Sequence, residues 1–180
     1  MRKRNADRKL MAAFFDLLET KSYEKISVAE IVEAAGLSRT TFYRYYTDVY
    51  DMYEKISVGV IDRIIAELTV TLTVKSISRS ERFQAFSEKL ESQKRYIKLL
   101  CGENGGKEFF EIVTKRVFYC MKEYGALLNT GDFFAVKFVF YSGIATYLKT
   151  IMDGTEFDSR YVEMYERIFA DAKEVGRENE

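Results

Sequence analysis

Hydrophobic residues near the start of the chain recur three or four positions apart, which is the spacing of one face of an α-helix. The residues at this spacing are Met11, Phe14, Phe15 and Leu18. They predict a first helix over residues 7–21.

Capping residues mark two short helices after the first. Ser27 and Glu30 have the spacing of a capping box, in which the serine hydroxyl accepts from a first-turn amide and the glutamate returns to the serine amide. Gly36 can take the left-handed conformation that ends a helix. Ser38 then caps a third helix, which we expect over residues 39–46.

Longer periodic segments follow, separated by polar breaks. A cap at Thr47-Asp48 opens a fourth helix that runs from Val49 towards Thr71, and the polar stretch 71–80 indicates a break. The later helices are expected over residues 81–100, 107–128, 132–152 and 158–175. The pattern predicts three short helices followed by a bundle of long ones.

Composition supports an all-α fold with an N-terminal helical domain, residues 1–48, and a helical-bundle domain, residues 49–180. The 180 residues include no proline and ten glycines, whereas sheet-rich folds need many tight turns built from Pro, Gly, Asn and Asp. Hydrophobic residues make up 47% of the chain and charged residues 31%, which is typical of a globular protein.

Residue usage excludes several kinds of catalytic and metal site. The chain contains no histidine, which excludes His-based triads and a Cys/His zinc site. Its two cysteines, Cys101 and Cys120, are interpreted as reduced, packed thiols, with a redox switch as the alternative. We therefore expect no catalytic residue, no metal and no cofactor.

The stretch from Cys101 to Glu108 resembles a phosphate-binding loop only in part. Cys101 stands where that loop needs its first glycine, and Glu108 stands where a Ser or Thr must follow Lys107. We interpret it as a turn between two helices.

We expect a cytoplasmic protein without a membrane segment. The start Met1-Arg-Lys-Arg lacks the apolar run of a signal peptide. The most apolar stretch, residues 133–148, is interrupted by Lys137 and is shorter than the roughly 20 residues that span a bilayer.

The turn at Gly36 places two short helices in a helix-turn-helix arrangement, in which the second helix enters the major groove of DNA. Phe42 and Tyr46, four residues apart, would face the core. The exposed polar positions are Arg39, Thr40, Thr41, Tyr43 and Arg44. Arginine pairs with guanine, threonine with bases or phosphates, and tyrosine hydroxyls with phosphates. A helical corner with a solvated face is the alternative that the geometry alone leaves open.

Positive charge is concentrated at the N-terminus although the whole chain is neutral, with 28 basic and 28 acidic residues. Neutrality argues against a protein that coats DNA through net charge. Only Asp7 opposes the basic residues among positions 1–9, which are Arg2, Lys3, Arg4, Arg8 and Lys9. This N-terminal arm would follow the DNA backbone or enter a minor groove.

At these residues the sequence resembles the TetR family of helix-turn-helix transcriptional regulators. The resemblance covers about residues 7–55 and is most specific from Ile26 to Asp48. The shared features are the serine that opens the second helix, the Ala-Gly-Leu-Ser turn and the Phe-Tyr-Arg-Tyr-Tyr run of the third helix. Beyond residue 55 the resemblance is limited to length and helix layout.

The resemblance implies a homodimeric repressor that binds double-stranded operator DNA and is released by a small-molecule effector. The implied base readers are Arg39, Thr40 and Arg44. The implied phosphate contacts are Ser27, Thr41, Tyr43 and Tyr45, with Ser27 at a helix N-terminus. Two positions depart from the family. Val49 stands where a phosphate-binding lysine is usual, and Val32 stands where a small residue is favoured.

The predicted helix 132–152 is apolar nearly all round and must be buried on most sides. Ser142, Gly143 and Ala145 would let another helix approach closely. The resemblance implies that this helix and the last one, 158–175, form the seam of a dimer. A core within one chain is the alternative. A symmetric dimer would prefer a roughly palindromic operator.

Aromatic residues of the middle helices are the candidates for an effector pocket, although each also fits an ordinary core. They are Phe83, Phe86, Tyr96, Phe109, Phe110, Phe118 and Tyr119. The main alternative function is a helical interaction or adaptor protein that does not bind DNA. An activator is also left open.

Overall fold

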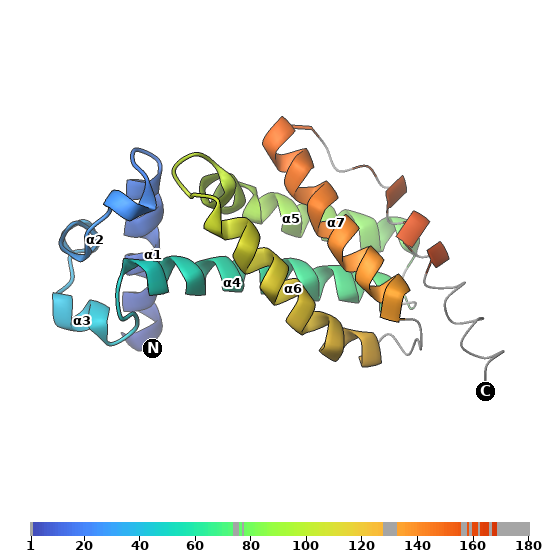
Figure 1. Ribbon diagram of the computed structural model, residues 1–180, viewed down its shortest axis with the longest axis horizontal. Helices are drawn as coiled ribbons and strands as arrows, with labels where there is room; N and C mark the ends of the chain where they lie inside the picture. The colour runs from blue at the N-terminus through green and yellow to red at the C-terminus, as the bar shows by residue number, and fades with distance from the viewer. Residues whose placement is uncertain are drawn as a thin grey trace. The chain divides into compact units, whose positions relative to one another are not determined.

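Every regular secondary-structure element in the described part of the computed structural model is a helix, as the sequence pattern predicts (Figure 1). The structure describes residues 2–73, 76, 78–127, 133–155, 158, 160, 161, 163–165, 167 and 168. Its elements are α1 (Arg2–Leu18), a 3-10 helix η1 (Tyr23–Lys25), α2 (Val28–Ala35), α3 (Arg39–Tyr43), α4 (Val49–Thr73), α5 (Arg79–Cys101), α6 (Glu108–Leu127) and α7 (Phe133–Asp153).

Two helices differ from their predicted ranges by more than two residues. α1 begins at Arg2 and ends at Leu18, because its first turn is polar and carries no hydrophobic periodicity that would mark it. α3 ends at Tyr43, since the amides of Tyr45 and Tyr46 both bond to the Phe42 carbonyl, at 2.9 and 3.0 Å, and tighten the last turn. Most of the predicted last helix, 158–175, lies outside the described residues.

Local capping explains why α2 and α3 are separate helices. Ser27 Oγ accepts from the Glu30 amide at 3.3 Å, and a Glu30 carboxylate oxygen accepts from the Ser27 amide at 2.9 Å, so the predicted capping box is confirmed. Gly36 ends α2 with φ of 63°, a conformation that costs a residue with a Cβ free energy. Ser38 Oγ accepts from the Thr41 amide at 3.2 Å and opens α3.

The chain forms two compact units. The first comprises Met1–Val60 and Arg95–Ile112, and the second comprises Ile61–Lys94 and Val113–Glu180. A segment far along the chain thus packs with the N-terminal helices, which hydrophobic periodicity does not reveal. The predicted functional division at residue 48 stays a prediction.

The first unit is built around fully buried side chains from α1, α2, α3 and α4. Phe14, Ile31, Phe42 and Met52 are each 0% exposed. Aromatic and aliphatic groups from four helices therefore share one core, so α2 and α3 are held against α1 and α4 by burial of apolar surface.

Polar contacts join the helices of the second unit. The Arg116 guanidinium on α6 donates to Asp62 Oδ2 on α4 at 2.9 Å. The Tyr147 hydroxyl on α7 donates to the Leu90 carbonyl on α5 at 2.7 Å, and both residues are buried. Within the described ranges, every helix is too short or too polar to cross a membrane.

Removal of the Phe42 ring should destabilise the first unit strongly. We expect Phe42→Ala to lower the free energy of unfolding by about 3–5 kcal/mol, because it leaves a cavity under the helix-turn-helix. Urea denaturation followed by circular dichroism measures this. Tyr50→Ala is the matched control, since Tyr50 is 50% exposed. Equal losses in the two variants would contradict the packing described here.

Candidate nucleic-acid interface

α3 presents its polar side chains to solvent on the face opposite the core. Arg39, Thr40 and Arg44 are exposed, and Tyr43 is 57% exposed. Thr41 and Tyr45 are partly exposed. The structure therefore brings the predicted α3 residues together on one continuous surface.

The opposite face of α3 holds the helix in place, as predicted. Phe42 is fully buried and Tyr46 is 6% exposed. The Phe42 ring packs edge-on against Tyr43 with centroids 5.6 Å apart. A rigid aromatic base thus lies directly beneath the exposed residues.

A hydrogen bond fixes the end of α3 to the beginning of α1. The Tyr46 hydroxyl donates to Asp7 Oδ1 at 2.6 Å. Burial, followed by this contact with Asp7, raises the pKa of Tyr46 far above its ordinary value. The hydroxyl is therefore a permanent donor. Sequence reasoning missed this pair, since the two residues are 39 positions apart and no local pattern links them.

α4 fixes the segment that leaves α3. Lys55 Nζ donates to the Tyr45 carbonyl at 3.1 Å and to Asp51 Oδ2 at 2.8 Å. Asp51 Oδ2 also accepts from the Thr47 amide at 2.8 Å, and its own amide donates to Asp48 Oδ1 at 2.7 Å. Sequence reasoning found the cap at Asp48 but not Lys55, although the i,i+4 spacing of Asp51 and Lys55 was a signal for it.

The positive charge of α3 is not neutralised by the protein. Among the described residues, neither Arg39 nor Arg44 forms an ion pair with a carboxylate; the Arg44 guanidinium lies 5.4 Å from the Tyr45 ring centroid. Arg8 and Lys9 are exposed on α1, whereas the side chains of Arg2, Lys3 and Arg4 lie outside the described residues. The surface therefore attracts an anion such as a phosphate backbone.

The Ser27 hydroxyl is already engaged at the N-terminus of α2. It donates to a Glu30 carboxylate oxygen at 2.7 Å, and Lys21 pairs with the same carboxylate. Hydrogen bonds from Lys21, then from the Ser27 hydroxyl and amide, lower the pKa of Glu30 to about 2. A carboxylate thus occupies the anion position of this helix end, and the predicted phosphate contact of Ser27 stays a prediction.

Val49 lies at the edge of a hollow of about 440 Å³ in the first unit. Its lining residues are Tyr23, Glu24, Ile26, Val28, Asp48, Val49 and Tyr50. Its lining includes the carboxylates of Glu24 and Asp48 and no cationic side chain. No cation in this lining therefore replaces the lysine that is usual at the position of Val49. Val32 is buried, at 7% exposure, and packs as core.

The aromatic residues proposed for an effector pocket are distributed over different surroundings. Phe86 and Phe109 are buried, whereas Phe110, Phe118 and Tyr119 are 44%, 48% and 55% exposed. The Tyr96 ring packs against Phe15 in a tilted arrangement, with centroids 4.6 Å apart and 46° between the ring planes. The side chain of Phe83 lies outside the described residues. Exposed rings on α6 do not line an enclosed pocket, and the assignment of effector contacts to this set stays a prediction.

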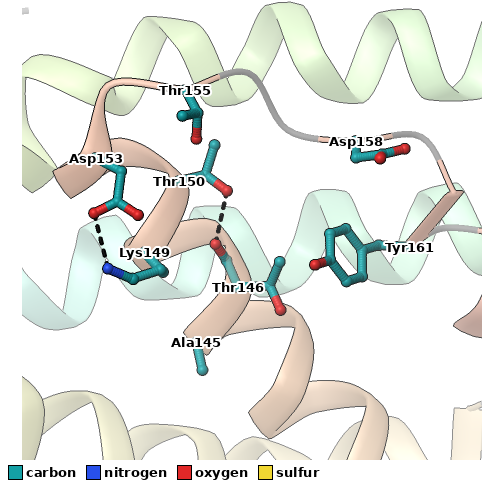
Figure 2. Close-up of a pocket in the computed structure, with 8 residues that line it drawn as sticks. All are labelled: Ala145, Thr146, Lys149, Thr150, Asp153, Thr155, Asp158 and Tyr161. Carbon is teal, nitrogen blue, oxygen red and sulfur yellow. Dashed lines mark hydrogen bonds and ion pairs between the residues drawn. The ribbon is translucent and has the colours of Figure 1, made fainter.

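A cavity of about 500 Å³ lies elsewhere in the second unit, beside the C-terminal half of α7 (Figure 2). Its lining is largely polar: Ala145, Thr146, Lys149, Thr150, Asp153, Thr155, Asp158 and Tyr161. Lys149 and Asp153 pair at 2.9 Å along the helix, and Figure 2 shows Asp158 and Tyr161 on the side away from them. None of the seven predicted aromatics belongs to it. In the described ranges no cluster of side chains is suited to a metal ion.

Residues 10–56 match the family model described as "Bacterial regulatory proteins, tetR family". The match covers α2, α3 and the anchoring contacts of Asp51 and Lys55. Residues 10–56 are thus similar to the DNA-binding segment of TetR-family transcriptional regulators. The matched segment contains α2 and α3, which form its DNA-binding helix-turn-helix.

Solved structures extend the TetR-family likeness to the whole fold. A transcriptional regulator of the "TerR/AcrR family" from Aquifex aeolicus VF5 has a TM-score of 0.56 and 17% identity, over 94% of this chain and 99% of that one. The fatty acid degradation regulator FadR from Bacillus halodurans has a TM-score of 0.55 and 12% identity, over 91% and 94%. At such low identity these matches show the fold alone. No curated protein matches the chain in sequence.

The low pKa of Glu30 predicts a pH-dependent contribution to stability. Because its pKa falls from 4.5 to about 2 on folding, this contribution is fully present above about pH 5 and is lost as the pH falls towards 2. Glu30→Gln keeps a capping side chain but removes the titrating group. We expect the difference in unfolding free energy between wild type and Glu30→Gln to be constant near neutrality and to shrink between pH 5 and 3.

Urea denaturation at several pH values measures this difference. Glu33→Gln, at an exposed position of the same helix, is the control and should show no such trend. An equally large effect of Glu30→Gln at pH 3 and pH 7 would show that the charged capping contact is not formed.

Proposed function

We propose that this chain is a homodimeric repressor of the TetR family that binds a roughly palindromic operator through α3 and is released by a small-molecule effector. The observation that carries the DNA-reading part is the pair Arg39 and Arg44, which are exposed and, within the described part of the chain, unpaired with carboxylates. A cytoplasmic location follows from the position of bacterial DNA.

The order of residues along α3 supports separate roles in reading and anchoring. Arg39 and Thr40 stand in its first turn, where side chains reach base edges when a recognition helix enters the major groove. Arg44 follows at its C-terminal end. Tyr43 and Tyr45 bear hydroxyls suited to phosphate oxygens. Thr41 pairs with Ser38 through hydroxyl oxygens 3.0 Å apart, so its phosphate contact would require that hydroxyl to turn or to share its proton.

An exposed apolar stripe on α7 supports the homodimer. Phe138, at 45% exposure, and Met152, at 55%, stand two heptads apart, with exposed Ala145 midway between them. The opposite face of α7 is buried: Ile144, Tyr147, Leu148 and Ile151. This stripe, which the exposed Lys149 interrupts, lies on a helix whose other face already packs in the core, so a further partner would cover it.

The segment after α7 adds apolar side chains to the proposed seam. Tyr161 and Met164 are each 39% exposed, while Tyr165 is fully buried. A second copy of the chain would cover both elements through a symmetric interface. The effector rests on the family's usual switch, and we assign no chemical class to it.

Selection from a random pool of double-stranded DNA tests the reading function. We expect the wild type to enrich an inverted repeat, and Arg39→Ala and Arg44→Ala each to weaken binding to it by about tenfold to a hundredfold, as one lost bidentate base contact of ~1–3 kcal/mol requires.

The control is Arg63→Ala/Arg167→Ala, which removes two exposed arginines of the second unit and matches the charge change of an Arg39/Arg44 double variant. No enriched site, or equal binding by both double variants, would favour the adaptor protein that does not bind DNA.

A charge placed in the apolar stripe of α7 should separate the subunits. We expect Phe138→Glu and Met152→Glu to yield monomers in sedimentation velocity, because each would bury an unpaired carboxylate in the seam. Phe118→Glu, on an α6 residue of similar exposure, is the control and should leave the dimer intact. A wild-type monomer, or variants that remain dimeric, would refute this seam.

A further inference from the structure

The turn between α5 and α6 packs on the chain that links α1 to η1, all within the first unit. The Asn104 carbonyl accepts from the Tyr23 amide at 2.9 Å. The Asn104 side-chain amide donates to the Leu18 carbonyl at 3.0 Å. One residue thus supplies an acceptor to η1 and a donor to the last residue of α1.

Glycines on both sides of Asn104 let the turn fold tightly against the end of α5, and Gly106 lets it approach Tyr23. A Cβ on Gly102 would lie 2.7 Å from the Lys98 carbonyl oxygen, and one on Gly105 would collide with the Leu100 carbonyl. Gly106 has φ of 82°, and its Cβ position lies 3.0 Å from the Tyr23 ring. This is the glycine-rich stretch that resembles a phosphate-binding loop only in part. The structure shows that its glycines serve close packing of one backbone against another.

The last two turns of α5 add contacts to the same region. Arg95 donates to Glu19 at 2.7 Å and to Asp16 at 3.1 Å. The Tyr53 hydroxyl donates to the Leu100 carbonyl at 3.2 Å in a buried setting. The Arg95 pairs are exposed and contribute little, so the buried and half-buried contacts dominate. We call Arg95, Tyr96, Leu100 and Asn104 the clasp.

The clasp holds one end of α1, and the Asp7–Tyr46 bond joins the other end of α1 to the end of α3. α1 therefore transmits the position of the clasp to the DNA-reading helix. α5 and α6 each have residues in both compact units, and the four residues of the clasp all belong to the first unit.

We propose that Asn104 is a positioning residue that fixes α1–α3 on α5 and α6 and so sets the half-site spacing that the dimer accepts. This inference rests on the proposed dimeric function. Asn104 does not touch DNA. Its loss would leave the reading surface intact but let each helix-turn-helix shift on its own subunit.

Asn104→Asp tests the inference with little change in volume, because it replaces the amide donor by a carboxylate facing the Leu18 carbonyl. Glu103→Ala, at the exposed neighbouring position of the same turn, is the control. Binding is measured on the selected inverted repeat, on repeats with one base pair added or removed, and on a single half-site. One base pair rotates a half-site by about 35°, since B-DNA turns once in 10–10.5 base pairs.

We expect Asn104→Asp to bind the single half-site as the wild type does. On the selected repeat it should bind about threefold to tenfold more weakly, the range for one lost hydrogen bond, and its preference for the selected spacing should fall by a similar factor. Glu103→Ala should match the wild type on every duplex. Equal weakening on all duplexes, single half-site included, would mean a merely structural role and overturn the inference.

Hydrogen exchange of the full-length protein gives a readout that needs no DNA. The Tyr23 amide, which donates to Asn104, should exchange faster in Asn104→Asp, while amides of α7 keep their wild-type rates. An unchanged exchange rate of the Tyr23 amide would overturn the claim that the Asn104 side chain holds this segment in place. A wild type that selects no inverted repeat would refute the proposed function and this inference together. If the wild type selects an inverted repeat and Asn104→Asp keeps the same spacing preference, the inference alone is refuted.

Discussion

The DNA-reading helix α3 has five residues, and a helix of one and a half turns does not form by itself in water, because nucleation costs more than so few hydrogen bonds return. Every useful property of its exposed face therefore depends on what surrounds it. Ser38 caps its first turn, Phe42 buries its inner face, and two contacts hold the residues that follow it: Tyr46 donates to Asp7, and Lys55 donates to the Tyr45 carbonyl. Loss of these supports would leave Arg39 and Arg44 without fixed positions, even though the two side chains themselves were unchanged.

Charge pairing separates the arginines that hold the fold from those that remain available to a ligand. Arg116 pairs with Asp62, and Arg95 pairs with Asp16 and Glu19. Arg39 and Arg44 have no such partner among the described residues. In a chain whose basic and acidic residues are equal in number, the net charge conceals this difference. The carboxylates beside the end of α3, those of Asp7, Asp48 and Asp51, bond to other groups and leave the two arginines without an ion pair in the described part of the chain.

Local signals predicted most of this fold, because capping boxes, a left-handed glycine and helical periodicity act within a few residues. Contacts between distant residues had no such signal: Asn104 and Leu18 are 86 positions apart. The aromatic set stays a prediction, and its members differ in exposure. On α6 the buried positions are Phe109, Ile112, Val113, Val117 and Cys120. Phe110, Phe118 and Tyr119 lie outside that buried face. Helical spacing distinguishes these three positions from the buried ones, whereas aromatic character does not.

Packing of the core under α3 contributes more free energy than each hydrogen bond that attaches α1 and η1 to the turn between α5 and α6. The core under α3 contains several fully buried side chains, and loss of one large ring costs about 3–5 kcal/mol. Each hydrogen bond of the clasp contributes only about 0.5–1.5 kcal/mol. An effector that distinguishes two states by about 1–3 kcal/mol, the usual size of an allosteric coupling, would be too weak to unfold the helix-turn-helix. It would match the two hydrogen bonds of Asn104, which together contribute about 1–3 kcal/mol. A regulator built this way would move its DNA-reading surface as an intact body, so that spacing and not base reading is what the switch changes.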